Sequence, residues 1–183
     1  LFVFLSERIF KPLGMTSAVD FDEGRMSPVP ADPQGYRRLA LNPPSPAPGE
    51  APGWMFGAGG LAMTAEDLAK WNISLANRSL LKPASYDELY KSSKLNTGAD
   101  INYSLGLQVR RAADGRLWLG HTGEVAGFVA ATRTWPEEKT SIVVLTNVEA
   151  KDAKVRGDAA ARGALLTPIA KAFSTDIGNE VAY

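Results

Sequence analysis

The chain has 183 residues, of which 45% are hydrophobic and 22% charged, and its formal net charge is zero. Both fractions are near globular averages, and a complete domain of this size buries roughly 70% of the surface that its unfolded chain exposes. There is no basic block and no apolar run long enough to span a bilayer, so nucleic acid and membranes are not expected partners. Cysteine is absent and His121 is the single histidine, which excludes disulfides, thiol catalysis and multi-imidazole metal sites. We expect no metal and no cofactor.

The opening stretch, residues 1–15, predicts a helix. Its apolar residues recur at helical spacing, at Phe2, Leu5, Ile9 and Phe10. The helix is expected to end at Pro12 and Gly14, because such a pair stops helices. The chain begins with Leu1 and has no basic n-region or cleavage site of a signal peptide, so we expect it to begin within a longer protein.

The composition changes between Ser27 and Gly53, where eight of the twelve prolines lie. Few periodic apolar residues occur there, so a long loop is predicted over 27–53. Two helices are predicted after it. One runs from the N-cap Thr64 to about Ala76, and the other covers 84–90 after Pro83.

After Gly98 the apolar period changes from helical to alternating. We predict strands over 103–109, 116–120, 128–135 and 141–147, followed by an alanine-rich helix over 150–173. The strands show no parallel crossover pattern, so the order of elements indicates an α+β fold with an antiparallel meander. The chain is expected to divide into a helical part over 1–100, which includes the Pro-rich loop 27–53, and a part over 101–183 with the strands and the last helix.

The segment Gly120–Phe128, with the sequence GHTGEVAGF, lies between two predicted strands. Taken alone, it could be a hairpin whose glycines serve the turn and whose histidine is incidental. It resembles the K/H-T-G motif of the penicillin-binding-protein and β-lactamase superfamily, in the H-x-G form of the esterase, aminopeptidase and class C-like branches. Four more stretches resemble landmarks of that family in the same order: Glu7–Met15 (ERIFKPLGM), Ala58–Trp71 (AGGLAMTAEDLAKW), Tyr103–Leu107 (YSLGL) and Val143–Asn147 (VVLTN). In the third stretch, Ser104 replaces a glycine and Leu107 stands where tryptophan is frequent.

The resemblance covers about residues 1–150 and implies a β-lactamase/DD-peptidase-like fold, an antiparallel sheet with flanking helices, of which this chain is the C-terminal part. It implies a serine hydrolase that acts through an acyl-enzyme on an ester, a β-lactam or a D-amino-acid peptide. His121 would be an electrostatic or proton-shuttling residue, and Thr122 would turn its hydroxyl to the substrate. Gly123 would let the strand backbone approach the substrate, and the Glu124 N–H would form half of an oxyanion hole.

The stretch before the AGG landmark often lines the substrate cleft in this family, and the same is expected of Met55, Phe56 and Gly57. The four tryptophans are expected in the core or in a pocket wall. The resemblance favours a periplasmic or secreted location, and it does not separate esterase, peptidase and β-lactamase activity.

Two motifs of the family have no clear counterpart in these 183 residues. Its acylating serine lies in S-x-x-K at the start of a helix, and Y-x-N supplies a second acid/base group; both normally precede the segment that Glu7–Met15 resembles. Neither Tyr-x-Asn nor the G-x-S-x-G elbow of α/β-hydrolases occurs here. Ser79-Leu80-Leu81-Lys82 fits S-x-x-K only formally, because Pro83 disfavours helical geometry at Lys82.

We therefore expect the chain alone to be inactive, with its nucleophile in the N-terminal half of the same fold or in another chain. The alternative is a non-catalytic half-domain that binds a ligand or a partner. A half-domain would leave sheet edges and apolar helix faces bare, which favours association.

Overall fold

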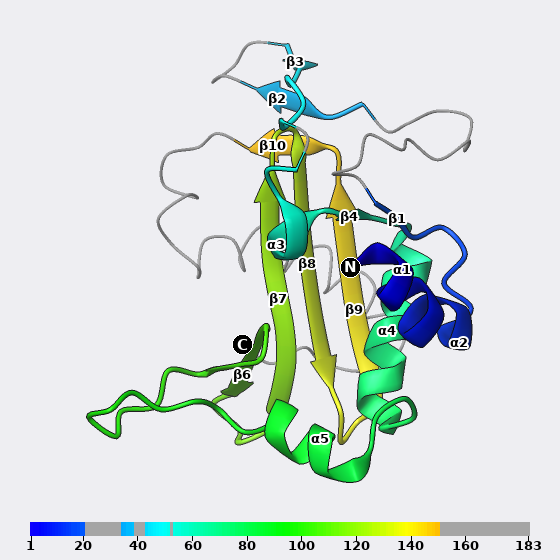
Figure 1. Ribbon diagram of the computed structural model, residues 1–183. Helices are drawn as coiled ribbons and strands as arrows, with labels where there is room; N and C mark the ends of the chain where they lie inside the picture. Colours follow the sequence, from blue (N-terminus) through cyan, green and yellow to red (C-terminus); the bar gives the residue numbers. More distant parts are fainter. Residues whose placement is uncertain (21–33, 39–42, 52, 151–183) are drawn as a thin grey trace. The chain divides into compact units, whose positions relative to one another are not determined.

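A computed structural model describes residues 1–20, 34–38, 43–51 and 53–150 (Figure 1). These residues form two compact units. The larger unit holds 1–20, 50–51, 53–123 and 130–145, and the smaller holds 34–38, 43–49, 124–129 and 146–150. The predicted helix over 150–173 falls outside the described residues, and the predicted domain boundary at residue 100 stays a prediction.

The N-terminal segment is helical from its second residue. Helix α1 (Phe2–Leu5), the π-helical turn η1 (Ser6–Phe10) and helix α2 (Lys11–Leu13) follow one another without a break. Gly14 ends α2 in the left-handed conformation at φ 66°, as its place after the predicted helix suggested. Phe10 is buried and its ring packs against that of Phe2, 5.8 Å away between centroids, so the predicted helix and its end are confirmed.

Among the described residues, three helices follow the short strand β1 (Val19–Asp20), which pairs antiparallel with β4 (Leu61–Ala62). They are α3 (Phe56–Gly59), α4 (Ala65–Asn77) and α5 (Pro83–Leu89). The Thr64 hydroxyl caps α4 by accepting a hydrogen bond from the Asp67 N–H at 3.2 Å. Both helices that were predicted after Thr64 and Pro83 are therefore confirmed.

The core of the helical layer lies between α4 and α5. Leu75, Tyr86 and Leu89 are buried there, and partly buried apolar side chains pack around them: Trp71, Tyr90 and Leu107. The Tyr86 hydroxyl is satisfied because it accepts hydrogen bonds from the backbone N–H groups of Leu80 and Leu81. Leu107 belongs to the sheet, so this cluster joins the helices to it.

The main sheet has the strand order β5-β6-β7-β8-β9, which is a meander (Figure 1). Its members are β5 (Tyr103–Ser104), β6 (Leu107–Arg111), β7 (Leu117–Val125), β8 (Phe128–Trp135) and β9 (Thr140–Thr146). Strands β6 and β7 pair antiparallel, with Val109 opposite Leu119, and both side chains are buried. The α+β class and the antiparallel meander are confirmed.

Two strand predictions need correction. The strand predicted over 103–109 is wrong as one piece, because Leu105 and Gly106 adopt φ values of 40° and 91° and turn the chain back between β5 and β6. Apolar residues alternate on both sides of this two-residue turn, and the resulting sequence pattern is the same as that of a single strand. The strand predicted over 116–120 continues to Val125, so the H-T-G residues lie inside β7 and not in the turn after it.

The smaller unit contains a three-stranded sheet of order β10-β2-β3. Strands β2 (Tyr36–Arg38) and β3 (Ser45–Pro46) lie within the stretch that was predicted as one loop over 27–53, so that prediction is wrong for these residues. Strand β2 pairs parallel with the distant β10 (Val148–Ala150), and the Asn147 side-chain amide donates to the Gln34 carbonyl at 3.0 Å. Local sequence does not reveal such a long-range pairing.

Candidate functional site

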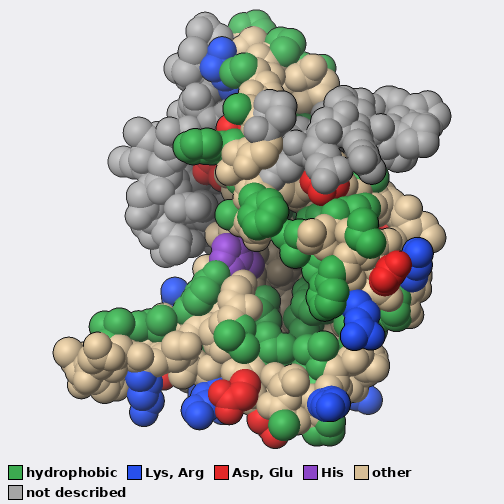
Figure 2. Space-filling model, in the orientation of Figure 1, with side chains coloured by type: hydrophobic (Ala, Val, Ile, Leu, Met, Phe, Trp, Pro, Cys, Tyr) green, Lys and Arg blue, Asp and Glu red, His purple; other side chains and the backbone are tan. Residues whose placement is uncertain are grey.

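The H-T-G-E residues occupy the second half of β7 at a place where its neighbour ends. The pairing of β6 with β7 begins at Arg111–Leu117 and reaches only Gln108–Gly120, and β6 itself begins at Leu107, so no β6 residue in this register lies opposite 122–124. His121, Gly123 and Glu124 are exposed and Thr122 is half-buried. Figure 2 shows the imidazole at the molecular surface. One edge of this stretch is therefore not covered by a described strand of the main sheet.

The two glycines of this strand have opposite surroundings. A Cβ atom at Gly120 would lie 2.1 Å from the Thr132 carbonyl oxygen, so this position has no space for a side chain. A Cβ atom at Gly123 would meet nothing closer than the Ala130 Cβ at 4.0 Å. The fold therefore requires glycine at 120, and it leaves room above position 123.

Alternation along β7 places His121 and Gly123 on one face of the sheet, and Thr122 and Glu124 on the other. A molecule lying along the strand edge could reach side chains on both faces, together with backbone groups. A molecule lying flat on one face could reach only His121 or only Thr122. The arrangement therefore suits a ligand that binds along the edge.

His121 has a neighbour that the sequence did not single out. The Tyr103 hydroxyl lies 2.9 Å from His121 Nε2, and the two rings meet edge to face with centroids 5.7 Å apart. Tyr103 was expected to be one residue of a longer strand, within the YSLGL resemblance. The turn at Leu105 and Gly106 folds β5 back against β6, which is the neighbour of β7 in the sheet. A prediction of that turn from Gly106 could have placed Tyr103 near β7.

The three expected cleft residues lie at the start of α3. Met55 is its N-cap, Phe56 is 69% exposed at a positive φ of 36°, and Gly57 is exposed. Trp54 beside them is 74% exposed and so is not a core residue. A positive φ at a bulky residue is a strained conformation that often accompanies functional sites. None of the contacts that the structure records for His121 involves these residues, and their place in a cleft stays a prediction.

The formal S-x-x-K match lacks the geometry that its chemistry needs. In a helix, serine and lysine three positions apart share a face. Here Ser79 follows the left-handed C-cap Arg78 of α4, and Lys82 is extended at φ −66° and ψ 148° before α5 begins. Ser79 and Lys82 are therefore not arranged as a nucleophile and its base at the start of a helix.

Among the described residues, no group of three or more His, Cys, Asp or Glu residues is placed to hold a metal ion. None of the helices in the described part of the chain has the length and apolarity needed to cross a bilayer.

Comparison with known proteins identifies the family. The family model described as Beta-lactamase matches residues 1–166. The chain belongs to the beta-lactamase family. The comparison with curated proteins gave no match.

Solved structures of several other proteins share this fold. An octameric penicillin-binding protein homologue from Pyrococcus abyssi is 24% identical, with a TM-score of 0.65 over 79% of this chain and 33% of its own. A D-stereospecific amidohydrolase from a Streptomyces species is 23% identical, with a TM-score of 0.65 over 82% and 45%. A penicillin-binding protein from Bacillus halodurans is 20% identical, with a TM-score of 0.66 over 89% and 49%. The chain thus spans a third to about half of the length of these proteins.

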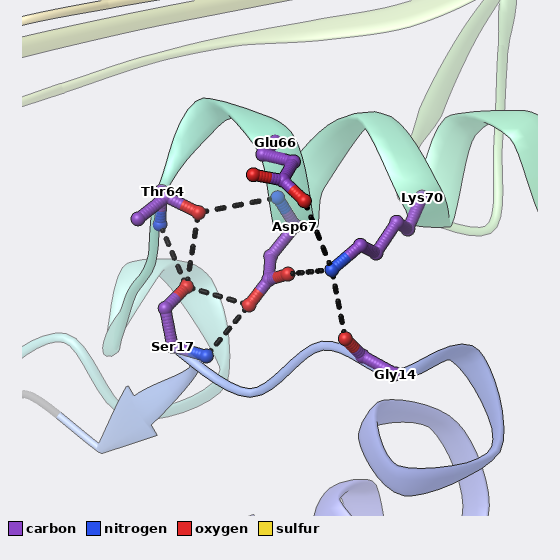
Figure 3. A network of polar contacts seen from close by, with 6 residues as sticks. All are labelled: Gly14, Ser17, Thr64, Glu66, Asp67 and Lys70. Atoms are coloured by element: carbon purple, nitrogen blue, oxygen red, sulfur yellow. Dashed lines mark hydrogen bonds and ion pairs between the residues drawn. The ribbon is translucent and has the colours of Figure 1, made fainter.

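In this beta-lactamase family member, a polar network joins two of the landmark segments (Figure 3). The carboxylate of Asp67 accepts hydrogen bonds from the backbone N–H and the hydroxyl of Ser17, both at 2.6 Å, and from Lys70 Nζ at 2.7 Å. Lys70 also donates to the Gly14 carbonyl at 2.8 Å. The network fastens the chain after α2 to the first turns of α4.

The network also sets the charge state of its members. Burial of the Asp67 carboxyl raises its pKa, but hydrogen bonds from Lys70 and Ser17 outweigh this and hold the pKa below its ordinary value. The hydrogen bond to Asp67 raises the pKa of Lys70. The pair is therefore ionised at neutral pH, and we read it as structural because every polar partner belongs to the two segments that it connects.

Proposed function

We propose that this chain supplies the H-T-G strand of a serine hydrolase that acts through an acyl-enzyme on an ester, a β-lactam or a D-amino-acid peptide. The observation that carries the proposal is the edge of β7 at 122–123, which no described strand of the main sheet covers, with the exposed imidazole of His121 beside it and space next to Gly123 for a ligand. The family match and the likeness to penicillin-binding proteins and to a D-stereospecific amidohydrolase support it.

The residues of the edge would divide the work of binding and charge stabilisation. The acyl group of the substrate would lie along β7, where Gly123 leaves space for it, and the Thr122 hydroxyl would bond a polar group of the substrate. The Glu124 N–H would be one of two oxyanion donors, with the amide of the acylating serine as the other. Loss of one such donor costs on the order of 100- to 1,000-fold in rate.

The covalent step needs a serine from an S-x-x-K helix outside these 183 residues. Its oxygen would attack the acyl carbon while the lysine takes the hydroxyl proton, and that proton would pass to the departing alcohol or amine. Water would then release the acid from the acyl-serine. His121, next to these groups, would stabilise charge or carry a proton between them.

The test is acylation of the full-length protein. It would be incubated with a fluorescent penicillin and with a fluorophosphonate, and the labelled serine would be located by mass spectrometry. The expected result is one adduct, on a serine in S-x-x-K encoded upstream of Leu1 and followed by Y-x-N, while the 183-residue chain alone stays unlabelled. Failure of both probes, together with no hydrolysis of p-nitrophenyl acetate, nitrocefin or D-alanine p-nitroanilide, would contradict the proposal, as would an adduct on Ser79.

A second candidate, a non-catalytic module that binds a partner, is favoured by one observation. An open groove of about 530 Å³ lies between the N-terminal helix, α4, α5 and the β5–β6 turn, and its apolar walls include Ile9, Trp71, Leu81, Leu89 and Leu105. A start codon near Leu1, no upstream motif and no labelling would select this candidate. An S-x-x-K serine that becomes labelled would reject it.

A further inference from the structure

Tyr103 is held firmly where it meets His121. Its carbonyl accepts a hydrogen bond from the Ser93 N–H at 2.8 Å, and its own N–H donates to the Ser92 hydroxyl at 3.2 Å. The next residue, Ser104, is buried and donates its hydroxyl to the Glu88 carbonyl of α5 at 3.0 Å. The backbone of Tyr103 is thus fixed by residues 92 and 93 and, through Ser104, by α5.

His121, by contrast, is a solvent-exposed side chain on a strand. Its recorded contacts are the hydrogen bond of Nε2 to the Tyr103 hydroxyl and the edge-to-face packing of the two rings. An exposed hydrogen bond competes with water and adds little to stability. Its main physical effect is to select one orientation of an imidazole that could otherwise rotate.

The same bond decides which ring nitrogen remains available. In a neutral imidazole one nitrogen donates and the other accepts. If Nε2 carries the proton, it donates to the tyrosine oxygen; if it does not, it accepts from the tyrosine hydroxyl. In either tautomer Nε2 is occupied, and Nδ1 is the nitrogen that can meet another group.

We infer that Tyr103 is a positioning residue for His121. The tyrosine hydroxyl holds Nε2 of the imidazole, so that Nδ1 faces the reacting groups of the acyl transfer. The inference rests on the proposed function, because it assigns a task within that site. It adds a residue from the β5–β6 hairpin to a site whose catalytic residues were all predicted on β7.

The first test compares amide replacements of the histidine in the full-length protein. The amide nitrogen of asparagine stands near the place of Nδ1, and that of glutamine near the place of Nε2. Both changes should lower kcat for p-nitrophenyl acetate, because neither amide can carry a proton. We expect His121→Gln to lose at least about 10-fold more than His121→Asn, because only the asparagine amide can hydrogen-bond from the place of Nδ1. The opposite order would overturn the inference.

The second test removes the tyrosine hydroxyl. Tyr103→Phe should lower kcat about 10-fold with little change in KM, because orientation and not binding is lost. The loss should vanish in the His121→Asn background, where no Nε2 remains to be held. Tyr90→Phe is the matched control, since its hydroxyl donates to the Leu75 carbonyl inside the helical layer. An equal Tyr103→Phe loss in both backgrounds would contradict the inference.

A spectroscopic test separates this inference from the proposed function. In ¹⁵N NMR spectra of the full-length protein, the His121 signals are assigned by their absence in His121→Asn. Tyr103→Phe should shift the Nε2 resonance and speed its proton exchange, whereas Tyr90→Phe should not. Unchanged signals would overturn the inference even in an active enzyme. If the protein is not acylated, the proposed function fails, and the NMR comparison alone decides whether Tyr103 holds the imidazole.

Discussion

Gly35 and Gly127 touch backbone to backbone in the smaller unit. A Cβ atom on Gly127 would lie 2.6 Å from the Gly35 backbone and 2.8 Å from the Ala47 side chain. The Tyr36 N–H hydrogen-bonds to the carbonyls of Gly127 and Asn147, and the Ala47 N–H bonds to that of Gly35. The turn between β7 and β8 is therefore held by β2 just beyond Glu124.

Replacing Gly127 by alanine should destabilise the protein. The residue has φ 81°, which alanine adopts at a cost, and the new methyl group would enter the Gly35 backbone. We expect a loss of about 2 kcal/mol in the free energy of unfolding, measured by urea denaturation. Gly49→Ala is the matched control, because nothing lies within 4 Å of its Cβ position. Equal stability of the two variants would show that the close contact is absent in solution.

Two glycine replacements on β7 should separate folding from function. Gly123→Ala should leave the thermal midpoint unchanged, because its methyl group would only reach the Ala130 Cβ at 4.0 Å. If the substrate lies along this edge, the same methyl group should slow acylation by about 10- to 100-fold. Gly120→Ala should instead unfold the protein at lower temperature, because its methyl group would overlap the Thr132 carbonyl. Normal acylation by Gly123→Ala would count against binding at this edge.

The Asp67 network should contribute measurably to stability. Asp67→Asn replaces a carboxylate oxygen that accepts two Ser17 donors with an amide, so we expect a loss of about 2 kcal/mol in urea denaturation. Glu66→Gln is the control, because Glu66 pairs with the same Lys70 at 3.4 Å but is 81% exposed. That change should stay within about 0.5 kcal/mol. A Glu66→Gln loss as large as that of Asp67→Asn would contradict the structural role given to Asp67.

The same aspartate should make stability depend on pH in the acid range. Its pKa is lower in the folded protein than its ordinary value of 3.8, so the folded state favours the ionised form. Its contribution is present above about pH 3.8 and is lost as the pH falls through the lower folded-state pKa. The stability difference between the wild type and Asp67→Asn should therefore shrink in that range. Asp100 and Asp114, whose pKa values are also lowered, are common to both proteins and cancel in the difference.

Sequence reasoning succeeded where the determinants of structure are local. Thr64 caps α4 through a bond to a residue three positions later, and Gly14 ends α2 through its own backbone conformation. Periodicity located β8 to the residue, because its flanking turn residues, Gly127 and Pro136, are distinctive. It joined β5 and β6 into one strand because Leu105 is not a typical residue for a positive φ.

Only those residues of the candidate site that lie on one continuous stretch of the chain could be predicted from the sequence. The resemblance to the K/H-T-G motif identified His121 and Gly123 as candidate site residues. Whether a ligand can reach the edge of their strand depends on where β6 stops pairing with β7, and the motif does not show this. The bond between Tyr103 and His121 depends on a hairpin and on packing against α5, neither of which a motif contains. Strand β2 escaped prediction because its partner β10 is remote in sequence. Strand β3 escaped because its own residues, Ser45 and Pro46, favour turns.

The pairing of β2 with β10 also has a consequence for the order of folding. Residues 36–38 must find residues 148–150, whereas β7 and β8 are joined by a two-residue turn. Closing a long loop costs entropy before any hydrogen bond is gained, so β7 and β8 should pair first and β2 should pair with β10 late. Pulsed hydrogen exchange should accordingly protect the Tyr36 amide after the amides of β7, and simultaneous protection would count against this order. The turn next to Glu124 would then be the last part of the site to become ordered as the newly made chain folds.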